Sequence, residues 1–103
     1  MKLELKKSTK KGKKYMMIFS EDGKRSKTQH FGALGYDDRT LIKDPTERKK
    51  RYTSYQKRHR GDKINDKKSS GALAWYILWS ADSVSGGIKN YEKRFRVNVI
   101  NKT

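Results

Sequence analysis

The core of this chain must form around one uncharged run, Gly71-Ala72-Leu73-Ala74-Trp75-Tyr76-Ile77-Leu78-Trp79. The run holds both tryptophans of a protein in which 37% of the residues are charged. As a helix it would span about 13 Å, whereas a bilayer crossing needs about 20 apolar residues. Its large apolar side chains would point in every direction around a helical axis. We therefore expect the run to be buried on most sides, as a core element or as one that a partner covers in part.

Length and composition bound the rest of the fold. A chain of 103 residues predicts a single small basic domain over residues 1–103, with a correspondingly small core. Apolar residues make up 32% of the sequence, but the 11% of aromatic residues and several periodic apolar runs favour a folded centre. The absence of cysteine excludes disulfides, thiolate metal sites and cysteine nucleophiles, and it fits an intracellular compartment. Because Met1-Lys2 leads directly into charged residues, no signal peptide is expected.

The net charge indicates what kind of partner the protein has. Its 27 lysines and arginines exceed its 11 acidic residues by 16. Such an excess destabilises the folded state by self-repulsion and favours polyanionic or acidic partners. Nucleic acid, an anionic membrane surface and the acidic face of another protein all meet this requirement, and charge does not choose among them.

The N-terminal third has the pattern of a small antiparallel sheet. Residues 2–6 alternate between polar and apolar side chains, as a half-buried strand does. Residues 15–20 predict a second strand, and Asp22-Gly23 is typical of a hairpin turn. Residues 26–31 then return as a third strand. We therefore predict a three-stranded antiparallel meander over residues 2–32.

A lysine-rich turn joins the first two predicted strands. The structural interpretation is a solvated hairpin loop, which we favour, and the functional one is a flexible tip that contacts phosphate. Its six lysines are Lys6, Lys7, Lys10, Lys11, Lys13 and Lys14.

The sequence Asp44-Pro45-Thr46-Glu47 predicts the start of a helix that runs to about His59. Asp44 can cap this helix, Pro45 suits its first position, and Glu47 would complete a capping box. One face of the helix carries an aromatic seam, and the rest carries positive charge. The seam consists of Arg48, Tyr52, Tyr55 and His59, and the charged positions are Lys49, Lys50, Arg51, Lys57 and Arg58.

The remaining elements complete an α+β fold. Ser70 is expected to cap the apolar run, and a last helix is expected from about Ser83 to Phe95, with a terminal strand at residues 97–100. The predicted architecture is a meander followed by two or three helices, over residues 44–95, around a core rich in tryptophan and tyrosine. The residues expected to anchor this packing are Tyr52, Tyr55, Trp75 and Trp79.

The sequence gives little support for a catalytic or metal-binding site. His30 and His59 are far apart in the sequence, which disfavours metal ligation. Carboxylates of the 37–47 region could form a magnesium cluster of a nuclease. The simpler interpretation makes Asp44 and Glu47 helix caps, and Asp37 and Asp38 turn residues. Without a phosphate-binding loop or a catalytic dyad, we predict no catalytic or metal-binding residue, no cofactor and no small-molecule substrate.

Aromatic residues interleaved with basic ones favour a different kind of site. Tyr52 and Tyr55 lie among the cations of residues 48–58, and Tyr91 lies beside Lys89 and Lys93. Nucleic-acid-binding proteins combine base stacking and phosphate contacts in this way. Tyrosines at helical spacing in a chain short of aliphatic residues also build cores, and for these rings we favour the core.

Several spaced signatures resemble a family of short basic proteins encoded by giant and algal large double-stranded DNA viruses. They are Lys27-Thr28-Gln29-His30-Phe31-Gly32-Ala33-Leu34-Gly35-Tyr36-Asp37-Asp38, residues 40–44, Glu47-Arg48-Lys49, Tyr52, Arg58-His59, Gly71-Ala72 and Ile77-Leu78-Trp79. Arg39 departs from the pattern, which has tyrosine there. The resemblance covers roughly residues 27–95 and implies a viral source and association with the virion or the genome. The family has no established catalytic activity, so the resemblance carries over no active site.

The function we expect is that of a non-enzymatic structural protein of a large icosahedral double-stranded DNA virus, located in the virion. It would be a minor capsid protein whose basic surfaces grip other capsid proteins, acidic protein surfaces or the anionic inner membrane. The alternative is a nucleic-acid-binding protein that assists genome packaging. The residues expected to contact a partner or phosphate are Lys6, Lys7, Lys10, Lys11, Lys13, Lys14, Arg48, Lys49, Lys50, Arg51, Lys57, Arg58 and Arg60.

Overall fold

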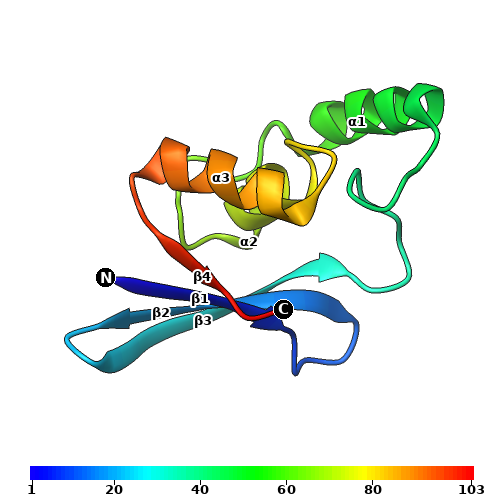
Figure 1. Ribbon diagram of the computed structural model, residues 1–103. Coiled ribbons are helices and arrows are strands. Elements are labelled where there is room, and N and C mark those ends of the chain that lie inside the picture. The colour runs from blue at the N-terminus through cyan, green and yellow to red at the C-terminus, as the bar shows by residue number, and fades with distance from the viewer.

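The computed structural model describes residues 1–103 and has two layers, a sheet and a set of helices that all lie on one of its faces (Figure 1). The α+β class and the order of its parts agree with the sequence prediction. In chain order the elements are β1 (Lys2–Lys7), β2 (Lys13–Glu21), β3 (Lys24–Ala33), α1 (Pro45–His59), α2 (Ser70–Leu73), the π-helical turn η1 (Ala74–Leu78), α3 (Val84–Phe95) and β4 (Val99–Asn101).

The predicted meander over residues 2–32 is present as β1, β2 and β3, each antiparallel to the next. The strand order is β3-β2-β1-β4, and β4 pairs in parallel with β1. The terminal strand was expected at residues 97–100 and lies at residues 99–101. Strand alternation buries one set of side chains under the helices. This set is Leu3, Leu5, Met17, Phe19 and Phe31.

The uncharged run packs on this buried face. Leu73, Ile77, Leu78 and Trp79 are buried, whereas Trp75 and Tyr76 are half-buried at the edge of the core. Their half-burial falls short of the burial on most sides that we expected. The expected cap was also one residue late, because Ser69, rather than Ser70, accepts the Ala72 N–H at 3.0 Å.

The helix α3 crosses the uncharged run at very close range. It starts at Ser83, whose hydroxyl accepts the Gly86 N–H at 3.1 Å. Gly87 is buried, and a Cβ atom at this position would lie 2.2 Å from the carbonyl oxygen of Ile77. The contact therefore requires glycine, because any side chain would collide with backbone atoms that cannot move independently.

The helix α1 lies apart from the other helices and packs through one face (Figure 1). Asp44 caps it as expected, accepting the Thr46 N–H at 3.1 Å, and Pro45 occupies its first turn. The expected capping box does not form. Glu47 instead binds Arg51 at 2.8 Å, one helical turn further on. No helix of this structure has the length and apolar character needed to span a bilayer.

Candidate functional site

Most of the positive charge has no carboxylate partner within the chain. Six of the 27 lysines and arginines form ion pairs, which leaves 21 without one. The six are Lys2, Lys14, Arg39, Arg48, Arg51 and Lys102. Unpaired cations at this density repel one another and attract an acidic counterpart. The candidate functional site is therefore a surface, and the question is where on the molecule these cations gather.

The lysine-rich turn between β1 and β2 contributes part of this surface. Lys7, Lys10, Lys11 and Lys13 are exposed, and Lys6 is partly exposed. Lys14 behaves differently from the sequence prediction. Its ammonium group binds the Asp38 carboxylate at 2.7 Å and the Tyr36 carbonyl oxygen, and only 11% of its side chain is exposed. Lys14 is thus a structural residue and not a free contact for a partner.

The helix α1 contributes the second part. Lys49, Lys50, Lys57 and Arg58 are exposed on it and have no carboxylate partner, and Arg60 follows at its end. Arg51 is exposed as well, and the hydrogen bond that its guanidinium donates to the Glu47 carboxylate raises the pKa of Arg51.

Arg48 does not join this surface, although the sequence placed it among the contact residues. Its guanidinium binds the Ile42 carbonyl oxygen at 2.9 Å and the Asp82 carboxylate at 3.3 Å. Arg39 binds the same carboxylate at 2.8 Å and lies 4.7 Å from the centre of the Tyr52 ring. Both arginines therefore fasten α1 and the preceding loop to the start of α3.

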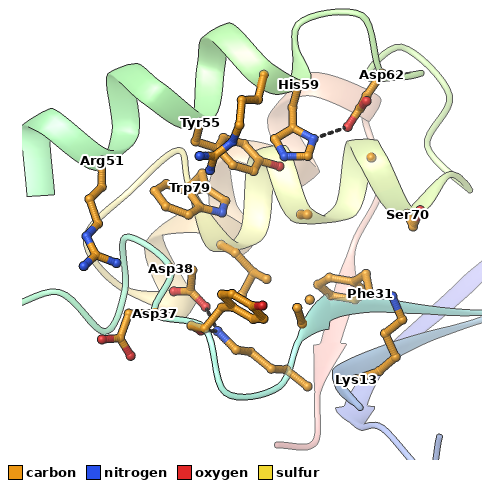
Figure 2. Close-up of a pocket in the computed structure, with 18 of the residues that line it drawn as sticks. Lys13, Phe31, Asp37, Asp38, Arg51, Tyr55, His59, Asp62, Ser70 and Trp79 are labelled. Carbon is orange, nitrogen blue, oxygen red and sulfur yellow. Dashed lines mark hydrogen bonds and ion pairs between the residues drawn. The ribbon is translucent and has the colours of Figure 1, made fainter. Parts of the chain in front are cut away.

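The aromatic seam of α1 packs ring on ring. Tyr55 is stacked on Trp79, with centroids 4.3 Å apart and ring planes 8° apart, and on His59, with centroids 4.4 Å apart. Since two stacked rings cannot share one face, both faces of Tyr55 are covered, as Figure 2 shows. Burial raises the pKa of Tyr55 above its usual value of 10. Tyr55 and Trp79 are buried, and Tyr52 and Trp75 are half-buried against the core.

A cleft of about 650 Å³ separates α1 from the loop that follows β3 (Figure 2). Phe31, Leu78 and Trp79 contribute apolar atoms to its lining. Lys13 reaches it from the β1–β2 turn, and Arg51 and Arg58 reach it from α1. One free lysine of the first basic segment and two arginines of the second, almost 40 residues apart in the chain, therefore line the same cleft. We call Lys7, Lys10, Lys11, Lys13 and the exposed cations of α1 the basic end of the molecule.

Two of the three carboxylates that line this cleft, Asp38 and Asp62, have structural partners, whereas the exposed Asp37 has none. Asp38 is buried, and it accepts hydrogen bonds from Lys14 and from the Thr40 N–H, the latter at 2.8 Å. His59 shares a 2.9 Å contact with Asp62. No group of three or more histidine, cysteine, aspartate or glutamate side chains in the structure could hold a metal ion. The four carboxylates considered for a magnesium cluster do not come together as a set of metal ligands, because Asp44 caps α1 and Glu47 binds Arg51.

This fold and surface define a small α+β protein with exposed cations beside a cleft of mixed polar and apolar lining. The chain belongs to a family of unknown function, DUF5754, whose model matches residues 3–59. The matched region contains the whole meander, the loop after β3 and α1. It therefore includes both basic segments and the loop between them. No curated protein and no solved structure matches the chain.

Sequence reasoning missed two features of this region. One is the buried Lys14–Asp38 pair, because a lysine in a run of lysines carries no signal that distinguishes it from its neighbours. The other is the exposure of Leu34, Tyr36 and Leu41 in the loop after β3, where apolar residues are otherwise expected to be buried. The sequence did place these three residues in a connecting loop, between the predicted third strand and the helix start at Asp44, and loop residues usually lie at the surface.

Proposed function

We propose that this protein is a non-enzymatic structural component of a large icosahedral double-stranded DNA virus, a minor capsid protein that bridges neighbouring proteins of the shell. The viral setting comes from the sequence resemblance. The observation that supports the binding part is that Lys13 of the first basic segment and Arg51 and Arg58 of α1 line a single cleft, while the other exposed cations of both segments have no carboxylate partner.

The basic end suits an acidic protein surface. Apart from Arg51, which pairs with Glu47, its cations have no carboxylate partner within the chain. A partner that supplies carboxylates therefore relieves repulsion between them as well as forming new ion pairs. Charge complementarity of this kind speeds encounter and fixes orientation, while apolar contacts supply most of the affinity. The apolar lining of the cleft provides such contacts beside the cations.

Nucleic acid is the second candidate partner, and the same cations would neutralise its phosphate groups. Binding of single strands also depends on aromatic faces on which bases stack. Here Tyr55 has rings on both faces, Tyr52 lies under Arg39, and Tyr91 is buried with its hydroxyl bonded to the Lys67 carbonyl oxygen at 2.6 Å. These three rings are thus engaged within the protein, and among the aromatic residues near the cations only Tyr36, which is 75% exposed, has an open ring. One open ring does not form a row of stacking faces, which favours a protein partner over a stacked single strand.

Mass spectrometry of purified, nuclease-treated virus particles tests the structural assignment. The protein is expected in the particles at a constant ratio to the major shell protein. Its absence from such particles would exclude a structural function.

A gel-shift assay with duplex DNA separates the second candidate from the first. A genome-binding protein loses affinity with salt along a log–log slope of about −0.9 for each phosphate neutralised. Detection in particles without a shift at about 50 mM salt supports the capsid assignment. The nucleic-acid assignment is supported instead if the protein is absent from shells and its affinity for DNA falls steeply with salt. In that case the double substitution Lys49→Glu and Lys50→Glu should make the salt dependence less steep.

A further inference from the structure

The loop between β3 and α1 exposes three large apolar side chains to solvent. Leu34 is 64% exposed, Tyr36 is 75% exposed and Leu41 is 53% exposed. Together with Tyr15 and Lys7 they border a shallow hollow of about 360 Å³. We call Leu34, Tyr36 and Leu41 the loop patch. Scattered exposed apolar residues are common, but three around one hollow on a single short loop mark an interaction site.

The backbone under the loop patch is held in place although its side chains are uncovered. The Leu34 N–H binds the Gly12 carbonyl oxygen at 2.9 Å, and the Leu41 N–H binds the Asp38 carbonyl oxygen at 3.0 Å. The buried Asp38 carboxylate ties Lys14 and Thr40 together beneath the loop. A preorganised backbone reduces the conformational entropy that is lost on binding, which favours affinity.

The surroundings of the loop patch select the partner. The Leu34–Gly12 hydrogen bond brings the lysine-rich turn alongside the patch, and the exposed Lys43 follows Leu41 in the chain. A second copy of this chain would bring another net charge of +16 against the first, which disfavours self-association. A hollow accepts a projecting side chain, which a protein offers and a flat lipid surface does not.

We propose that the loop patch is the apolar anchor of the interface, and that it receives an apolar side chain of a partner protein flanked by carboxylates. This inference rests on the proposed function, since it names the contact through which the acidic neighbour is gripped. In this arrangement the lysines orient the partner, while burial of the projecting side chain between Leu34, Tyr36 and Leu41 holds it.

Two synthetic acidic peptides test the proposal, identical except that one carries a central leucine where the other carries alanine. By fluorescence anisotropy at about 50 mM salt, the protein should bind the leucine peptide about tenfold more tightly. Leu34→Ser and Leu41→Ser should each reduce this preference and leave the affinity for the alanine peptide unchanged. Ile100→Ser is the matched control, because Ile100 is 43% exposed on β4, outside the patch, and should keep the preference.

The outcomes separate the anchor from the broader proposal. Equal affinity for the two peptides, or equal loss in Ile100→Ser, overturns the loop patch as anchor while leaving acidic binding in place. Failure to bind either peptide contradicts the proposed function as well. If Leu41→Ser instead weakens only binding to vesicles of phosphatidylcholine with phosphatidylserine, the patch belongs to a lipid contact and the proposal is wrong.

Discussion

Gly87 is the residue on which the packing of the helical layer depends most directly. An added Cβ atom would approach the carbonyl oxygens of Ile77 and Tyr76 to 2.2 and 2.7 Å. Both are backbone atoms of the π-helical turn, so relief requires α3 to move away from the core. The sequence offered no hint of this, because a glycine pair at the start of a helix usually indicates weak helix propensity rather than close contact.

The substitution Gly87→Ala should destabilise the protein by about 3 kcal/mol, since overpacking against backbone cannot be relieved by a rotamer change. Chemical denaturation monitored by tryptophan fluorescence measures the difference. Gly61→Ala is the control, because a Cβ atom there meets nothing within 4 Å. Equal stability of the two variants would contradict the close approach of α3.

The Lys14–Asp38 pair is the second feature that depends on single residues. Its ammonium and carboxylate are 2.7 Å apart, with 11% and 4% of the side chains exposed. Removing one partner of a buried pair leaves an uncompensated charge. The structural reason lies in the long-range contact between β2 and the loop after β3, which no local pattern in the sequence reveals.

Lys14→Met should therefore cost about 3 kcal/mol of unfolding free energy, whereas Lys13→Met, at the exposed neighbouring position, should change stability by less than about 0.5 kcal/mol. Urea denaturation of both variants provides the comparison. If both lysines prove equally dispensable, Lys14 is free in solution and the loop patch is not held as described.

At the scale of elements, the meander and α1 were predictable because their signals are local. Alternating side chains at Leu3 and Leu5 and the Asp22-Gly23 turn indicate strands, and Asp44-Pro45 indicates a helix start. The π-helical turn and the parallel pairing of β4 with β1 were not predictable, since tertiary packing decides both. The aromatic seam of α1 was correctly placed, but its stacking partner Trp79 could not be identified from spacing.

The cap of the uncharged run provides a test at this scale. Ser69→Ala should cost about 1 kcal/mol, because the Ala72 N–H loses its acceptor. Ser70→Ala removes a hydroxyl that caps nothing and should cost less than about 0.5 kcal/mol. Thermal unfolding of the two variants measures the difference in stability. A larger loss of stability in Ser70→Ala than in Ser69→Ala would show that Ser70 is the cap.

The attachment of β4 should depend on pH through Glu4. Hydrogen bonds from Lys102 and then Lys2 hold the pKa of Glu4 below its ordinary value of 4.5. Because the folded-state pKa is lowered, this stabilisation is present above pH 4.5 and is lost as the pH falls through the folded-state value. The protection factor of the Lys102 N–H against hydrogen exchange, corrected for the intrinsic exchange rate at each pH, should fall in that window, because this N–H binds the Leu5 carbonyl oxygen.

Glu4→Gln provides the control for this titration. The variant should show faster exchange of the Lys102 N–H at neutral pH and a weaker response to acid. An identical pH response in Glu4→Gln and the unaltered protein would assign the effect to another group.

At the scale of the whole molecule, the sequence gives the excess of positive charge directly, but it does not show how the cations are distributed over the surface. The turn at residues 8–12 and α1 are far apart in the chain. In the fold they lie toward the same side of the molecule, the turn beside the sheet and α1 in the helical layer, with the loop after β3 running between them (Figure 1). The exposed loop patch lies on the segment that joins β3 to α1. A cationic end with an apolar anchor is the arrangement expected of a protein that joins acidic neighbours.

Carbodiimide cross-linking of intact virus particles tests this account most directly, because the reagent couples a lysine amine only to a carboxylate in contact with it. The more accessible internal pair Lys102–Glu4, whose charged atoms are 2.6 Å apart, serves as the positive control. We predict that Lys10, Lys11, Lys49 and Lys50 become joined to aspartate or glutamate residues of a neighbouring shell protein. Particles in which Lys102 and Glu4 are joined while these four lysines remain uncoupled would contradict the proposed binding surface.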